Sequence, residues 1–154
     1  MPVLSTATKN FAPRADDVRA ARRFAATAAV CWGMDSRDVE TVVGELAANA
    51  FRHARTRFSV SLSCDDAVFA VEVADGSSGV PAITGRVRSR SFVSGRGLMM
   101  VEALANNWGA RTTPEGKIVW AELPAIRVHG APVSRSRGAG PRSQDGSSDR
   151  GPSG

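Results

Sequence analysis

The chain has 154 residues, of which 42% are apolar and 23% charged, so it has room for one globular domain and no second sizeable core. Its formal net charge of +5 would, taken alone, suggest a protein that binds polyanions. Residues 125–154, however, carry five arginines against two aspartates, whereas residues 1–124 hold 15 basic against 13 acidic side chains. Most of the excess positive charge therefore lies outside the part of the chain that can fold.

The first half of the chain predicts two helices and a hairpin. Residues 1–13 are an N-terminal lead-in with no predicted element. From residue 14 to about 30, apolar side chains recur at spacings of three and four, which predicts an amphipathic helix. A second helix runs from Asp35, which can cap it, to about Ala54. Strict alternation of apolar and polar residues then predicts a β-hairpin over residues 58–73.

The second half begins with a basic, glycine-bracketed stretch over residues 84–97, which has no clear period and is typical of a loop. A helix is predicted over residues 98–107, and a second hairpin over residues 108–123. This order of elements predicts an α+β fold, a two-layer sandwich with helices on one face of a mostly antiparallel sheet. Residues 14–124 form this domain. Residues 125–154 are half glycine, proline and serine, so we expect a disordered tail.

Cysteine use and hydropathy indicate the compartment. Cys31 and Cys64 have no C-x-x-C spacing and no cysteine-rich framework around them, so we expect two buried, reduced thiols. No apolar run approaches the length of a membrane span, and no apolar segment follows a basic start as in a secretion signal. We therefore expect a cytoplasmic protein without membrane contact.

Three polar residues in the segment GELAANAFRHA recur every fourth position: Glu45, Asn49 and His53. On a helix they share one stripe. The stripe could be a solvated outer face, but arginines on the other side of the helix already provide a charged surface, which favours a functional role. A glutamate can accept a proton from an attacking hydroxyl group. An asparagine oxygen one turn away is a hard, neutral ligand suited to Mg²⁺.

Two further motifs each suggest part of a nucleotide site. In VEVADGSSGVP, a strand delivers Asp75 at its end, where a carboxylate can accept from the exocyclic amine of a purine. Gly76 and Gly79 would let the backbone approach a planar base. In SGRGLMMVEAL, a glycine-rich loop leads into a helix N-terminus, which favours phosphate. Taken singly, an Asp-Gly pair is more often a turn and a glycine loop is usually only a loop.

Taken in order, these motifs resemble the GHKL or histidine-kinase-like ATPase domain. The segments ELAANAFRHA, VADGSSGVP, GRGLMMVEALANNWG and GKIVWAEL are similar to the RsbW-type anti-sigma factor serine/threonine kinases, and especially to small stand-alone actinobacterial ATP-binding regulators. The resemblance covers about residues 10–124. It implies ATP and Mg²⁺ as cofactors and the two-layer fold of that family.

The resemblance also implies roles for single residues. Glu45 matches the proposed general base, Asn49 the magnesium ligand and Asp75 the adenine-binding aspartate. Gly79 matches the glycine beneath the base. The phosphate side is assigned to the end of the loop and the start of the next helix, namely Gly95, Arg96, Gly97 and Leu98. Arg52 and His53 would lie near the nucleotide without an assigned role.

One residue departs from the family pattern. The superfamily writes the second motif as Asp-x-Gly-x-Gly, and Ser77 replaces the first of these glycines. Weaker or slower use of ATP would be consistent with this change. Lys117 follows a turn glycine, and we expect a surface lysine at the hairpin, although it could also reach phosphate.

The sequence thus predicts a kinase that phosphorylates a STAS-type anti-sigma factor antagonist and binds a sigma factor, with a homodimer as a possible form. The alternative is a non-catalytic module that uses bound nucleotide as a switch on a regulatory partner. Direct nucleic-acid binding is disfavoured, because no aromatic residues are interleaved with the arginines. With no sensor domain, phosphoacceptor helix or membrane anchor in the sequence, a complete sensor histidine kinase is excluded.

Overall fold

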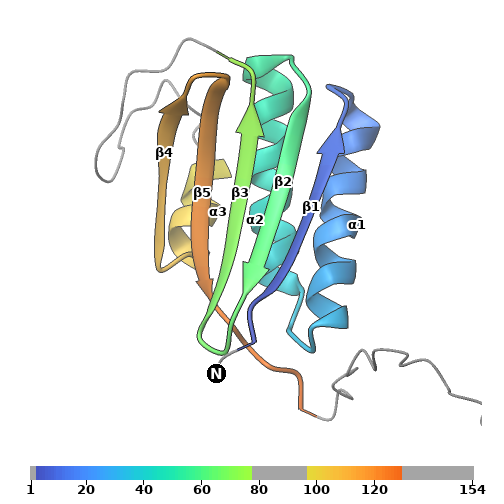
Figure 1. Ribbon diagram of the computed structural model, residues 1–154, viewed down its shortest axis with the longest axis vertical. Coiled ribbons are helices and arrows are strands. Elements are labelled where there is room, and N and C mark those ends of the chain that lie inside the picture. Colours follow the sequence, from blue (N-terminus) through green and yellow to red (C-terminus); the bar gives the residue numbers. More distant parts are fainter. Residues whose placement is uncertain (1–2, 78–96, 130–154) are drawn as a thin grey trace, which may run out of the picture.

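The computed structural model describes residues 3–77 and 97–129. Within them, one antiparallel sheet has the strand order β1-β2-β3-β5-β4 (Figure 1). The bounds of the strands are β1 Ser5–Phe11, β2 Phe58–Cys64, β3 Val68–Asp75, β4 Asn107–Thr113 and β5 Gly116–Pro124. The two predicted hairpins, β2–β3 and β4–β5, are confirmed and lie side by side through β3 and β5.

The helices cover one face of this sheet (Figure 1). They are α1 Ala15–Cys31, α2 Arg37–Asn49 and α3 Gly97–Leu104, and a π-helical turn, η1 Ala50–Ala54, follows α2 directly. The predicted α+β sandwich with helices on one face is therefore confirmed. None of the described helices is both long and apolar enough to cross a membrane.

The hydrophobic core lies between the sheet and α2. Residues in β2 and β3 alternate between buried and half-buried, and the buried set faces Val42, Val43 and Leu46 of α2. Fully burying one such side chain contributes about 1.5–3 kcal/mol. This burial holds α2 over the middle of the sheet, and with it the polar residues at the C-terminal end of α2.

The strand β1 occupies residues for which the sequence analysis gave no element. Its segment STATKN is polar because β1 is an edge strand whose residues before Phe11 are exposed or half-buried on both faces, so no apolar alternation marks it. Phe11 alone is buried, stacked on Phe58 with ring centroids 5.3 Å apart and packed edge-on against Phe24 at 6.1 Å. The backbone pairing with β2 and these ring contacts define the strand.

The second predicted helix changes its geometry before it ends. The α-helix stops at Asn49, the next turn is π-helical with the Arg55 amide donating to the Ala50 carbonyl, and Arg55 ends it in the left-handed conformation with φ of 52°. At the start, the N-cap residue is Ser36, so the prediction that Asp35 caps the helix is wrong; Asp35 lies one residue earlier and accepts from the Arg37 amide at 2.9 Å. Its pairing with Arg37 lowers the pKa of Asp35 to about 2.

The first few residues after β5 still bond to the rest of the domain. Ile126 accepts from the Asp35 amide at 2.7 Å, and Arg127 forms an ion pair with Asp66. The rest of the predicted tail, from residue 130, lies outside the described residues. Both cysteines are free, but the expectation that both are buried is wrong for Cys31, which is exposed at the end of α1, where the helix surface turns away from the core.

Candidate functional site

The C-terminal half of α2 carries two of the three residues predicted to share a stripe. Asn49 is only 4% exposed, and its Oδ1 has no hydrogen-bond partner in the described part of the chain. Glu45 lies one turn earlier and is half-buried. His53 belongs to the wider η1 turn and is exposed, so the change of helix type removes it from the stripe. Glu45 and Asn49 therefore remain the candidate pair on this helix, and their roles stay predictions.

Asp75 is the last residue of β3 and is 7% exposed. Its Oδ1 accepts two hydrogen bonds from Ser77, one from the amide at 2.9 Å and one from the hydroxyl at 2.7 Å. The following amide, of Gly76, donates to Thr56 Oγ1 at 2.8 Å, which ties the end of β3 to the segment after η1. The carboxylate is thereby held in one orientation at the edge of the helix-covered face.

Lys117 faces Asp75 from the neighbouring strand. The two residues are direct cross-strand partners, and Lys117 Nζ lies 3.4 Å from Asp75 Oδ2, with the two side chains 3% and 1% exposed. The expectation of a surface lysine is wrong. Because residues two apart in a strand share a face, Lys117 lies on the same side as the buried Val119 and Ala121. Counting this alternation backward from the apolar residues would have found it.

Gly116 makes the approach of β5 to β3 possible. Its φ is +156°, and a Cβ atom at this position would lie 2.0 Å from the carbonyl oxygen of Asp75. No side chain fits there, so the backbones of the two strands come into close contact beside the ion pair. This glycine therefore fixes the position of Lys117 relative to Asp75.

The phosphate side of the predicted site is described only in part. The helix α3 begins at Gly97, as expected for a helix that follows a glycine-rich loop, and packs against α2. Leu98 lies in its first turn. Gly79, Gly95 and Arg96 lie outside the described residues, and their assigned roles stay predictions.

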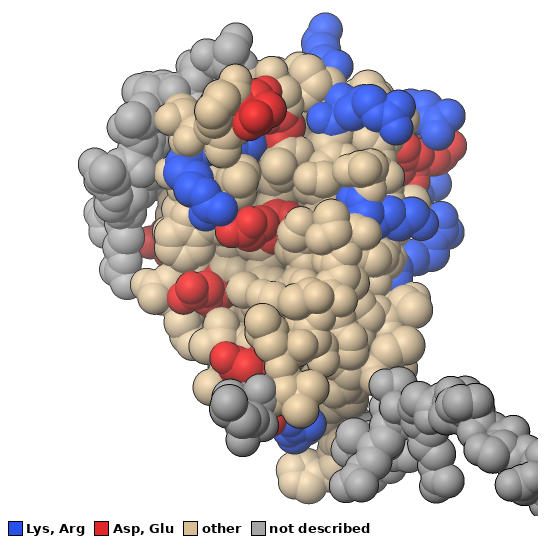
Figure 2. Space-filling model, viewed as in Figure 1, with Lys and Arg blue, Asp and Glu red and all other residues tan. Residues whose placement is uncertain are grey.

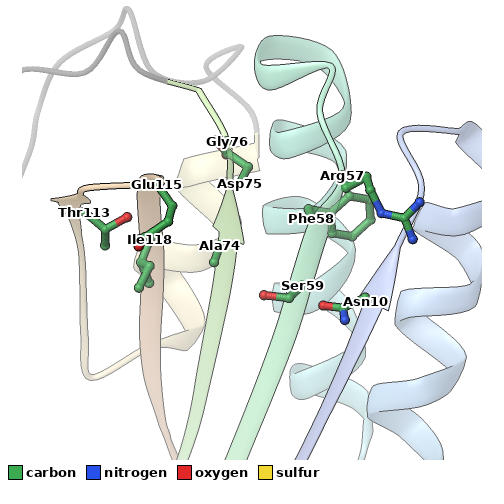
Figure 3. A pocket seen from close by; sticks show the side chains of 10 residues that line it. All are labelled: Asn10, Arg57, Phe58, Ser59, Ala74, Asp75, Gly76, Thr113, Glu115 and Ile118. Carbon is green, nitrogen blue, oxygen red and sulfur yellow. The ribbon is translucent and has the colours of Figure 1, made fainter.

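A separate groove of about 310 Å³ lies on the other face of the sheet (Figure 3). Ser59, Ala74 and Ile118 form its floor, and Arg57 and Glu115 lie at its margins. Asp75 and Gly76 contribute at the strand end, although the buried Asp75 carboxylate pairs with Lys117 toward the helices. The groove is therefore distinct from the space around Asn49.

The comparison with known families agrees with this arrangement. A family model described as the histidine kinase-like ATPase domain matches residues 11–123. The chain belongs to this family. No curated protein matches the sequence. The match runs from the end of β1 to the end of β5 and includes Glu45, Asn49, Asp75 and Lys117.

The ATPase domain is an ATP-binding domain, and Asn49 fits the magnesium ion that accompanies ATP in the implied chemistry. A buried acceptor without a partner costs about 1–3 kcal/mol, and a ligand at Asn49 Oδ1 would remove that cost. An amide oxygen is a hard, neutral ligand, and Mg²⁺ takes few protein ligands beside water and phosphate oxygens. No cluster of three or more His, Cys, Asp or Glu side chains that could hold a metal occurs among the described residues.

Proposed function

We propose that the ATPase domain is a protein kinase that transfers the γ-phosphoryl group of ATP to a serine or threonine of a small partner protein. The observation that carries this proposal is the pairing on α2 of a half-buried carboxylate, Glu45, with the unpartnered buried oxygen of Asn49 one turn away. Hydrolysis or transfer needs a base near the terminal phosphate and a group that holds the metal there, and one helix face supplies both.

In this mechanism each residue acts at a stated atom. The Asp75 carboxylate accepts a hydrogen bond from the exocyclic amine of adenine, and this bond orients the nucleotide. Asn49 Oδ1 would hold Mg²⁺, which neutralises charge on the phosphate oxygens when bound. Glu45 orients the incoming hydroxyl group and accepts its proton as the oxygen attacks phosphorus. The reaction consists mostly of positioning and charge stabilisation, so few side chains are needed.

The resemblance to RsbW-type kinases supports a specific partner class. We propose a STAS-type anti-sigma factor antagonist as the phosphoryl acceptor and a sigma factor as a second partner, with a homodimer as the form that binds them. Figure 2 shows acidic side chains across the middle of the open face and basic ones gathered toward the side of β1 and α1. Such a mixed surface supports protein partners over nucleic acid, which needs a continuous basic track.

The test is phosphoryl transfer by the purified chain with labelled ATP and candidate antagonists. Glu45→Gln removes the base while keeping the size of the side chain, and we expect transfer to fall by about 10²–10⁴-fold with nucleotide affinity retained. Transfer at the wild-type rate would overturn the role of Glu45. Glu40→Gln, on the same helix and bonded to Ser36 at 2.8 Å, is the matched control and should leave transfer unchanged.

A second candidate function is a nucleotide-dependent switch without phosphoryl transfer. The observation that favours it is Ser77, whose amide and hydroxyl group both occupy Asp75 Oδ1. A base that binds Asp75 must share the carboxylate with these bonds or displace them, which is consistent with weaker or slower use of ATP. Clear ATP binding and ATP-dependent partner binding without any labelled product, even with the correct antagonist, would select this function over the kinase.

A further inference from the structure

The proposed mechanism uses Asp75 but assigns nothing to Lys117, the buried cation beside it. Both side chains are almost fully buried, at 1% and 3% exposed. Burying an ammonium group is costly unless it is paired, and a lysine is seldom found inside a protein without such a reason. The Asp75 carboxylate compensates the charge of Lys117, but a pair of apolar side chains of similar size would stabilise the strands at least as well. The lysine therefore calls for a functional explanation.

The two oxygens of Asp75 have different neighbours. Oδ1 accepts both hydrogen bonds from Ser77, whereas Oδ2 faces the ammonium group at 3.4 Å. A carboxylate has about four acceptor positions, so it can take a further donor. Because Lys117 Nζ forms the ion pair with Asp75 Oδ2, a base that donates to this oxygen would have the ammonium group as a neighbour. The site thus presents a hydrogen-bond acceptor and a donor side by side.

This pair matches the edges of two kinds of purine. Adenine has a donor at its C6 amine and an acceptor at N1, which can meet Asp75 and Lys117 respectively. A 6-oxopurine such as hypoxanthine has the reverse pattern, an acceptor at O6 and a donor at N1, which can meet Lys117 and Asp75. A carboxylate alone would face O6 with no donor and would reject the oxopurine, because an unpaired buried polar group costs affinity.

We propose that Lys117 contacts the base and makes the site accept 6-oxopurine as well as adenine nucleotides. The inference rests on the proposed function only in requiring that a purine nucleotide binds at Asp75, and it is independent of whether phosphoryl transfer occurs. Lys117 is a specificity-determining residue in this account, and its contribution appears in the ratio of affinities for two bases.

The experiment measures the affinities of the full chain for ATP and inosine triphosphate (ITP) with Mg²⁺, by calorimetry. For the unmodified chain we expect ITP to bind within about tenfold of ATP. Lys117→Met removes the donor and should weaken ITP at least about tenfold more than it weakens ATP, because O6 then has no hydrogen-bond donor. Arg111→Met, which removes a half-exposed cation paired with Glu72 on the sheet, is the matched control and should leave the ratio unchanged.

Several outcomes would overturn the inference. Binding of ATP with ITP more than about a hundredfold weaker contradicts it, as does an equal loss of both nucleotides in Lys117→Met. If that variant does not fold, the affinity of the unmodified chain for 1-deaza-ATP tests the contact instead. This analogue lacks the N1 acceptor and should bind about tenfold more weakly than ATP. Equal binding of the two nucleotides contradicts the contact between Lys117 and the base. If the chain binds no purine nucleotide, the proposed function itself is wrong. ATP binding without phosphoryl transfer does not contradict the inference.

Discussion

At the scale of single residues, the chemistry of the site depends on polar groups buried without full satisfaction. Asn49 Oδ1 has no hydrogen-bond partner among the described residues, and Asp75 with Lys117 forms an ion pair almost closed to solvent. The sequence identified Asn49 and Asp75 through their motifs, because these residue types at these positions are unusual for a helix face and a strand end. Lys117 was missed, because a glycine-lysine step after a turn is common on protein surfaces.

Asn49→Leu tests whether this residue is kept for function at the expense of stability. Replacing a buried amide whose Oδ1 has no partner among the described residues by an apolar side chain of similar size should change the free energy of unfolding by less than about 1 kcal/mol or raise it. Magnesium-dependent nucleotide affinity should fall at the same time. Urea unfolding and nucleotide titrations with Mg²⁺ and with EDTA measure the two effects, and a strongly destabilised variant would show that Asn49 is structural.

The two cysteines should differ sharply in reactivity. Burial raises the pKa of the Cys64 thiol to about 11, whereas Cys31 is exposed. At pH 8 iodoacetamide should modify Cys31 alone in the folded chain, and both thiols after unfolding, which intact mass measures. Because an unfolded thiol ionises near pH 9, the native state loses the stabilisation due to neutral Cys64 as the pH rises from about 9 to 11. Rapid double labelling of the native chain would contradict the placement of Cys64.

At the scale of elements, strand pairing decides which residues meet. The register of β3 against β5 places Asp75 opposite Lys117, and Gly116 permits the close approach. Local periodicity predicted both hairpins correctly, but it contains no information on which strand lies beside which. The edge strand β1 was missed for a related reason, since its polar face carries no alternation and only Phe11 is buried.

The β3–β5 ion pair offers a test of this pairing. Asp75→Asn removes the carboxylate charge that faces the buried Lys117 ammonium group and should lower the free energy of unfolding by about 3 kcal/mol. Adding Lys117→Met removes that ammonium group as well, so the double variant should recover most of the loss. Urea unfolding of the four chains of this cycle gives the coupling energy. Simple additivity of the two single losses would argue against a direct contact.

At the scale of the whole molecule, charge and fold belong to different parts of the chain. The sheet and helices use residues that carry little net charge, while residues 130–154, which hold four arginines and two aspartates, lie outside the described residues. The basic character of the protein is thus no guide to the chemistry of the ATP-binding domain.

Deleting residues 130–154 tests this separation. We expect the shortened chain to elute from heparin at lower salt, because it loses net positive charge. Its affinity for ATP and its unfolding midpoint should stay the same within error, since residues 125–129, which bond to the domain, are retained. A large loss of nucleotide affinity would instead assign the tail a part in the site.

The sequence by itself determined the two-layer α+β class, both hairpins and the candidate roles of Glu45, Asn49 and Asp75, because periodicity and motif spacing are local properties. Only the tertiary structure decided that β1 joins the sheet, that His53 leaves the stripe and that Lys117 is buried against Asp75. Each of these depends on pairing or packing between segments far apart in the chain. Such contacts are set by strand register and burial, which no short stretch of sequence specifies.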